Sequence, residues 1–289
     1  MMWLPTGLEH NASALAWVVL ASLLEVAAYL TLTSPKARAW WKREWVVALA
    51  PVPYLAYAMP LGVFEPVGFL AILAAVALIS YWFSVVPKGW WADVGFIALM
   101  AAPLLFRLIP MAYARALPDV RLDFIGQLLW IRAGALAVER DRGLDGIGFG
   151  FWPNAAEWRI GLAYFAALLP CVFVLAWLTG FAQFQWPPWP WWETALRVVG
   201  TFFGILWVVA LSEEFFFRGI LQRWLGLIAT SVLFGMAHLG FREFPNWRFA
   251  IVAGVAGVFY GLAFRRTGSI RAAMVTHAFT VVTWKMLFR

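Results

Sequence analysis

The sequence predicts an all-α, polytopic helical membrane protein with about eight or nine transmembrane helices, since each span takes roughly 20 residues. Hydrophobic residues make up 64% of the 289 residues and charged residues only 13%, whereas soluble domains are about 45–50% apolar and about 25% charged. Tryptophan pairs such as Trp40-Trp41 and Trp90-Trp91 end apolar runs, where an interfacial aromatic belt is expected. Because lipid permits only helices and closed barrels to span it, and these runs have helical length, the spans are expected to be helices.

Composition and charge also exclude several classes of protein. A soluble enzyme, a disordered chain and a disulfide scaffold do not fit a chain this apolar with a single cysteine, Cys171. The net charge of +7 is typical of cytoplasmic loops that contact anionic lipid headgroups. The absence of a dense basic run argues against nucleic-acid binding. The sequence therefore predicts a multi-pass protein of the cell (inner) membrane, with the lipid bilayer as its surroundings and no nucleic-acid partner.

The first 113 residues are expected to form a set of amino-terminal transmembrane helices. Their apolar runs cover about residues 12–33, 45–64, 67–86 and 93–113. A basic segment from Lys36 to Arg43 follows the first run and marks a cytoplasmic loop. The first run is long enough to span and no basic region precedes it, so no cleavable signal peptide is expected.

Residues 114–158 form a segment of different character, because they are rich in arginine and in acidic residues. The apolar piece at 124–138 is short and contains Arg132, which predicts a loop with an interfacial or partly inserted helix. The glycine-rich piece at 143–150 is expected to be a loop. It does not fit a phosphate-binding loop, because no Lys-Ser/Thr follows it.

Residues 159–289 are expected to form a carboxy-terminal helical bundle. Its apolar runs cover about residues 160–180, 195–217, 224–240, 248–264 and 270–288. Orientation stays open, because positive-inside reasoning places both 34–44 and Arg265-Arg266 in the cytoplasm, whereas nine alternating spans place them on opposite sides. A partial insertion near 124–138, or one span fewer, would remove the conflict.

The carboxy-terminal bundle carries two adjacent acidic residues at the end of an apolar helix. Glu214 and Arg218 are i,i+4 neighbours with the acid first, the favourable order for an ion pair on a helix. Glu213 points about 100° away around the helix and lacks that partner. An unpaired carboxylate in a desolvated helix suits a general base. The sequence therefore predicts a paired Glu214 and an unpaired Glu213, unless these residues only end the helix at the interface.

Two of the three histidines lie in apolar helical runs of the same region. His238 ends the sequence Phe234-Gly-Met-Ala-His238, and His277 lies in the last apolar run, whereas His10 is near the amino terminus. One carboxylate and two imidazoles supply a water-activating base and hydrogen-bond donors for an oxyanion. Because burying each polar group alone is costly, we expect Glu213, His238 and His277 to converge on one site.

The order of these motifs resembles a known family. Glu-Glu-x-x-x-Arg, then Phe-x-x-x-His, then a later helical histidine is similar to the CAAX-prenyl-endopeptidase and bacteriocin-processing (CPBP, Abi) family of glutamic-type intramembrane peptidases. The resemblance covers about residues 197–289, which would be the core of the carboxy-terminal bundle. The rest of the chain is matched only in being polytopic.

The resemblance implies a function and a set of catalytic residues. The protein would be an intramembrane endopeptidase that hydrolyses a peptide bond in a membrane-tethered protein or peptide, without a metal or another cofactor. Glu213 and His238 would activate the water, His277 would hold the oxyanion, and Glu214 and Arg218 would complete the site.

One position departs from the pattern of the family, which commonly has Asn four residues after the last histidine. Val281 stands there in this chain. Thr280 is a possible substitute for the missing donor, Asn246 is a weaker candidate, and His277 acting alone is a third possibility.

Two other functions stay open on the sequence alone. Glu213, His238 and His277 would also suit a two-histidine, one-carboxylate zinc site, which would make a metallopeptidase, although no His-Glu-x-x-His motif is present. A catalytically inactive scaffold or transport protein is the second alternative. Transport would be better supported by two similar halves with broken helices, which the sequence does not show.

Overall fold

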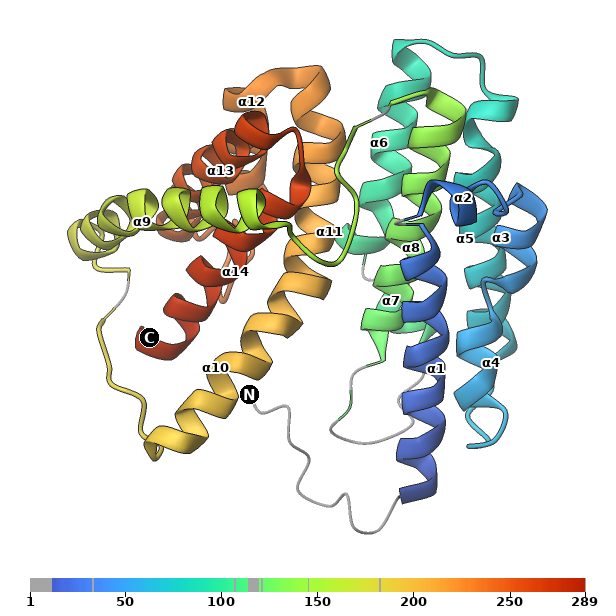
Figure 1. The fold of residues 1–289 in the computed structure, drawn as a ribbon, viewed down its shortest axis with the longest axis horizontal. Helices are drawn as coiled ribbons and strands as arrows, with labels where there is room; N and C mark the ends of the chain where they lie inside the picture. Colours follow the sequence, from blue (N-terminus) through green and yellow to red (C-terminus); the bar gives the residue numbers. More distant parts are fainter. Residues whose placement is uncertain are drawn as a thin grey trace. The chain divides into compact units, whose positions relative to one another are not determined.

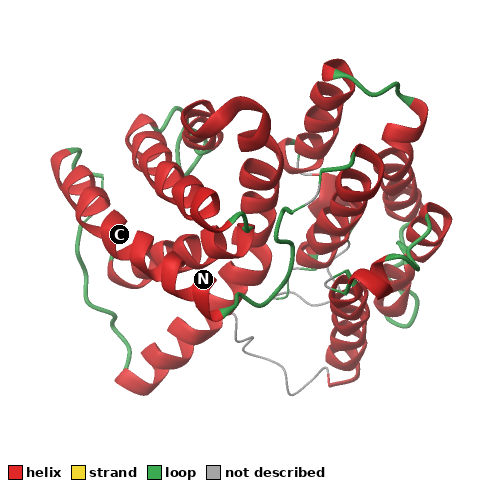
Figure 2. Ribbon diagram, turned by 45° about the horizontal axis from the view of Figure 1, so that its top comes forward, coloured by secondary structure: helices red, strands yellow, loops and turns green. Residues whose placement is uncertain are grey.

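The structure is a computed structural model that describes residues 12–288 except 33, 107, 114–119, 121, 145 and 182. His10 lies outside these residues. The described part is built from helices joined by loops (Figure 2). An isolated bridge pairs Phe184 with Phe288. The chain divides into two compact units, Met1–Asp145 and Gly146–Arg289. The all-α class is therefore confirmed, whereas the predicted division at residues 113 and 158 stays a prediction.

The described residues of the first unit form eight α-helices and one π-helical segment (Figure 1). They are α1 (Ala12–Thr31), α2 (Pro35–Arg38), α3 (Arg43–Leu49), α4 (Val52–Ala58), α5 (Pro66–Val85), α6 (Trp90–Leu105), α7 (Leu108–Ala112), α8 (Asp123–Leu136) and η2 (Ala137–Arg142). α1 packs against α4 and α8, and α5 packs against α3, α6, α7, α8 and η2.

Two of the long runs expected in this unit are broken into shorter helices. The run at 45–64 forms α3 and α4, which meet at Pro51, and the run at 93–113 forms α6 and α7. Proline lacks the N–H that a helix interior needs, so Pro51 favours the end of one helix and the start of the next. Hydrophobicity alone does not reveal such breaks.

Helix α8 is buried nearly all round by its neighbours in the first unit, including Arg132. Both guanidinium nitrogens Nε and Nη2 of Arg132 bind the carboxylate of Glu25 on α1, at 2.8 and 3.0 Å. The two side chains are 1% and 0% exposed, so each neutralises a charge that would be very costly alone. The position of this helix relative to a membrane interface stays a prediction.

A group of partly buried ion pairs lies near the start of α3 and the end of η2. Asp141 accepts hydrogen bonds from Arg43 and from Arg140, and Arg142 binds Asp93 at 2.6 and 2.8 Å. Burial acts to raise the pKa of Asp141, but the two arginines outweigh it and hold that pKa below its ordinary value. The charged residues that set 114–158 apart thus serve, in part, to fix helices of the first unit to one another.

The second unit contains α9 (Ala155–Leu178), α10 (Trp191–Gly204), α12 (Gln222–Ala237), α13 (Trp247–Thr267) and α14 (Ile270–Leu287). Three short segments lie between α10 and α12: η3 (Ile205–Ala210), α11 (Leu211–Glu214) and η4 (Phe215–Leu221). α14 is the central helix, because it contacts α9, α10, α11, α13, η3 and η4 (Figure 1). Glu213, Glu214, Arg218, His238 and His277 therefore all come from elements of this unit.

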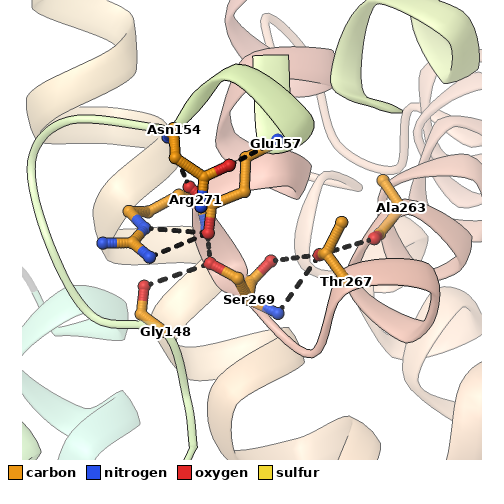
Figure 3. A network of polar contacts seen from close by, with 7 residues as sticks. All are labelled: Gly148, Asn154, Glu157, Ala263, Thr267, Ser269 and Arg271. Carbon is orange, nitrogen blue, oxygen red and sulfur yellow. Dashed lines mark hydrogen bonds and ion pairs between the residues drawn. The ribbon is translucent and has the colours of Figure 1, made fainter. Parts of the chain in front are cut away.

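A polar network ties the start of α14 to the start of α9 and to the loop before it (Figure 3). Arg271 donates to the carboxylate of Glu157 at 2.8 and 3.1 Å, and Glu157 forms a capping box with Asn154. Ser269 donates to the carbonyl of Gly148 at 3.3 Å. Gly148 has φ +67°, and a Cβ there would lie 2.3 Å from the Ser269 hydroxyl, so only glycine fits. The network fixes where α14 begins.

The turn between the two expected runs at 195–217 and 224–240 is at Gly226, which has φ 78° and ψ 175°. This left-handed backbone reverses the chain without loss of the flanking helices, because glycine has no Cβ to clash. α12 then returns to pack closely on α13. A Cβ on Gly235 would lie 2.5 Å from the carbonyl oxygen of Ala250, which shows how closely the two helices approach.

Five helical stretches among the described residues are long and apolar enough to cross a membrane. They are α1, α5, α9, the stretch Trp191–Ala237, which is kinked at Gly226, and α13. The protein is therefore an integral, multi-pass membrane protein. The count of eight or nine spans stays a prediction, since the remaining apolar helices are shorter or less hydrophobic.

The Glu25–Arg132 pair gives a test of this packing. Glu25→Gln should lower the free energy of unfolding by about 3–5 kcal/mol, because it leaves a buried guanidinium without its counter-charge. The double variant Glu25→Leu/Arg132→Met should recover most of the loss. Glu193→Gln is the control, since Glu193 and Arg197 form a more exposed pair worth about 0–1 kcal/mol. Equilibrium unfolding in mixed micelles measures all three, and equal small losses for Glu25→Gln and Glu193→Gln would contradict the account.

Candidate active site

The acidic pair lies on a short piece of α-helix between two wider π-helical segments. α11 contributes Glu213 and Glu214, and η3 and η4 flank it directly. π-Helical turns are rare and occur often at functional sites, where the extra residue per turn changes the direction of side chains. No feature of the sequence predicts them here.

Glu214 is the most enclosed acidic residue of the site. Its side chain is 0% exposed and lies 3.0 Å from Nε of Arg218, which is also 0% exposed. The contact is an ion pair by distance, but the angle does not make it a hydrogen bond. A hydrogen bond of 2.7 Å joins the other carboxylate oxygen to Nδ1 of His277. Glu214 is thus held between two basic groups. Arg218 was expected from its i,i+4 spacing, whereas His277 lies 63 residues away in the sequence.

Glu213 points away from that pair and toward both histidines. Its Oε2 atom lies 3.9 Å from Nε2 of His238 and 3.9 Å from Nε2 of His277. The same oxygen is buried and has no hydrogen-bond partner among the residues that the structure describes. The side chains of Glu213 and His238 are 27% and 22% exposed, whereas that of His277 is 4% exposed. The three residues expected to converge do lie together, with His277 on the inner side.

The hydrogen bonds at Nδ1 determine which imidazole nitrogens carry protons. Nδ1 of His238 lies 2.7 Å from the carbonyl oxygen of Phe234, which can only accept, so Nδ1 carries a proton. In a neutral ring, Nε2 of His238 is then an acceptor that faces another acceptor, Oε2 of Glu213. Two acceptors 3.9 Å apart need a shared donor between them, and a water molecule suits that spacing.

Two aromatic side chains surround the charged groups. Phe234 lies under the Arg218 guanidinium at 4.6 Å and makes ring contacts with both His238 and His277. Tyr260 stacks on His277 at 4.6 Å with an interplanar angle of 12°. Phe234 was visible in the sequence as the first residue of Phe-x-x-x-His. Tyr260 was missed, and its one signal was a hydroxyl-bearing aromatic residue within an apolar helix.

Arg218 is positioned by the neighbouring helix as well as by Glu214. Its Nη2 atom donates to the carbonyl oxygen of Gly257 at 3.0 Å. A Cβ on Gly257 would lie 3.4 Å from that nitrogen, so a side chain there would crowd the guanidinium. One turn further along each helix, Gln222 donates to the carbonyl of Gly261 in the same way, at 3.0 Å.

In the structure, both residues considered as substitutes for the missing amide already have hydrogen-bond partners. The hydroxyl of Thr280 donates its proton to the carbonyl of Thr276 at 2.7 Å, so that proton is not free for a substrate. Asn246 caps α13 through Phe249 N and donates Nδ2 to the carbonyl of Phe241 at 2.9 Å. Both polar ends of Asn246 are therefore used to hold the loop after His238.

No group of three or more His, Cys, Asp or Glu side chains among the described residues has the arrangement of a metal site. The Glu213, His238 and His277 atoms nevertheless supply ligand types that zinc accepts.

The fold and this cluster define an integral membrane protein with a buried carboxylate–histidine site, and comparison with known proteins agrees. Residues 194–283 match the family described as type II CAAX prenyl endopeptidase Rce1-like. The match lies in the region that the sequence resemblance covered, about residues 197–289. This relationship supports a membrane peptidase and assigns no role to individual residues.

One curated relative also matches. It is the uncharacterized protein YpbD of Bacillus subtilis (strain 168), which is 33% identical over 70 residues, or 24% of this chain. The match covers 36% of YpbD, so this chain spans about a third of the length of that relative. No solved structure matches.

The observed contacts of Asn246 predict a structural role. Asn246→Ala should lower the free energy of unfolding by about 0.5–2 kcal/mol, the usual effect of losing an N-terminal cap. Asn246→Asp keeps the acceptor that caps α13 and should lose less. Denaturant unfolding measures both variants. An Asn246→Ala protein as stable as the wild type would show that the cap contributes nothing.

Proposed function

We propose that this protein is a glutamic-type intramembrane endopeptidase that hydrolyses a peptide bond in a membrane-tethered protein or peptide. The observation that carries the proposal is the unpartnered Oε2 atom of Glu213, which faces two imidazole Nε2 atoms at 3.9 Å. A buried carboxylate oxygen without a partner is costly, and a reacting water is the group that would satisfy it.

Glu213 is the general base of the proposed reaction. A water between Glu213 and His238 donates one proton toward each acceptor, which leaves its oxygen lone pair directed at the peptide carbonyl. Glu213 takes the proton as the oxygen attacks, and a tetrahedral intermediate forms. The C–N bond then breaks, and the proton held by Glu213 passes to the leaving nitrogen, giving a carboxylic acid and an amine. Transfer of the acid proton to the amine leaves a carboxylate and an ammonium.

His277 is the proposed stabiliser of the oxyanion. This role needs a proton on Nε2 in addition to the one that Nδ1 shares with Glu214. That nitrogen faces the proposed water site, because it lies 3.9 Å from Oε2 of Glu213. A donor aimed at the developing charge in a dry site contributes strongly to the rate.

The zinc metallopeptidase and the inactive scaffold or transport protein are the competing functions. Zinc would use the same Glu213, His238 and His277 atoms, and it predicts loss of cleavage in chelator. A scaffold predicts no cleavage at all. The Rce1-like match at residues 194–283 favours a peptidase over a scaffold.

Purified protein in nanodiscs, incubated with membranes from cells that lack its gene, provides a test that needs no known substrate. Mass spectrometry of new peptide termini should detect cleavage by the wild type, also in the presence of chelator. Glu213→Gln keeps the size of the side chain and removes its basicity, so cleavage should fall by about 10²–10⁴-fold. His277→Ala should cost roughly 10²–10³-fold.

Three results would decide against the proposal. Full activity of a folded Glu213→Gln protein would show that Glu213 is not the general base. Loss of wild-type cleavage in chelator, restored by zinc, would favour the metallopeptidase. The absence of any new terminus with the folded wild type would favour the scaffold. Glu193→Gln, on α10, is the matched control and should cleave at the wild-type rate.

The missing amide at position 281 predicts an unusual gain of activity. Val281→Asn should raise the cleavage rate, because it adds a donor four residues after His277. Thr280→Val should cost far less than the roughly 10²–10³-fold loss of an oxyanion donor, since the Thr280 proton is already used by Thr276. The same assay measures both. A severe loss in Thr280→Val with no gain in Val281→Asn would show that Thr280 is the donor.

A further inference from the structure

We propose that Tyr260 positions His277, a role that rests on the peptidase function proposed above. The two rings are stacked nearly in parallel, with centroids 4.6 Å apart and planes 12° apart. Tyr260 comes from α13, whereas His277 comes from α14 and the acidic pair from α11. A third element of the unit therefore contacts the catalytic imidazole without carrying any of the expected catalytic residues.

The stack supplies a constraint that the other contacts of His277 lack. The hydrogen bond from Nδ1 to Glu214 fixes one edge of the ring, but a hydrogen bond alone tolerates tilting about its axis. Nε2 lies 3.9 Å from Oε2 of Glu213, which is too far for a hydrogen bond to that residue. A ring lying flat on one face opposes the tilt that would turn Nε2 away from Glu213.

Tyr260 is itself held firmly enough to act in this way. It is 2% exposed, and its ring makes a T-shaped contact with Phe234, with centroids 5.8 Å apart and planes at 83°. Phe234 also contacts His277 edge-on, at 6.0 Å and 85°. The imidazole thus lies flat on Tyr260 and nearly perpendicular to Phe234, so its orientation depends on the packing of both aromatic rings.

The ring and the hydroxyl of Tyr260 can be separated by substitution. Tyr260→Phe keeps the stacked ring, so cleavage of the membrane preparation described above should stay within about twofold of the wild type. Tyr260→Leu and Tyr260→Met fill much of the same volume without a flat face. Each should slow cleavage by about 10- to 100-fold, the scale expected for a misplaced catalytic group.

Two controls distinguish positioning from general packing. Phe264→Leu removes another buried aromatic ring from the same helix, one turn away, and should lower stability without a comparable loss of cleavage. In a His277→Ala background, followed over longer incubations, Tyr260→Leu should cost less than about twofold, because residues that act through one another are not additive.

Several outcomes would overturn the proposal. These are wild-type cleavage by a folded Tyr260→Leu or Tyr260→Met protein, a loss in Tyr260→Phe as large as in Tyr260→Leu, or full multiplication of the two losses in the double variant. Glu213→Gln is assayed in parallel. If it abolishes cleavage while Tyr260 can be replaced freely, the positioning role fails and the peptidase function stands. If Glu213→Gln is active, the peptidase function itself fails.

Discussion

Glu214 is a carboxylate with no exposure to solvent, and the rest of the site depends on how it is neutralised. Arg218 and His277 approach it from two elements, and Gly257 and Phe234 hold Arg218 in place. A buried charge without such partners would be strongly destabilising. Because Glu214 occupies Arg218 and one edge of His277, Glu213 is left with the second edge of His277 and with His238. The different contacts of the two adjacent glutamates follow from this one constraint.

The fold brings these partners together by means that are mostly apolar and steric. α12 and α13 approach closely at Gly235, α14 lies among the other helices of its unit, and the Arg271–Glu157 and Ser269–Gly148 contacts fix where it begins. These features set the height of His277 along the bundle. Arg132 and Glu25 show the same principle in the first unit, where one buried ion pair joins α1 and α8.

The features that the sequence could predict are those that depend on local spacing. Apolar runs gave the helical class and the approximate place of most helices, and the i,i+4 spacing of Glu214 and Arg218 gave their pairing. Contacts between distant residues could not be derived, such as His277 with Glu214 or Arg132 with Glu25, which is 107 residues away. The stacking of Tyr260, the π-helical segments beside α11 and the helix break at Pro51 also escaped hydrophobic periodicity, because they depend on tertiary packing or on backbone geometry.

The convergence of Glu213, His238 and His277 inside the bundle is the central claim, and cross-linking in native membranes tests it without any knowledge of the substrate. In a Cys171→Ala background, the variant Glu213→Cys/His277→Cys should be joined efficiently by a short bifunctional thiol reagent. Met236→Cys/His277→Cys is the control, because Met236 is 51% exposed on α12. Efficient joining of the first pair and little of the second is the expected result. With both cysteines shown to be reactive, the account would be contradicted if the first pair were not joined, or if both pairs were joined to the same extent.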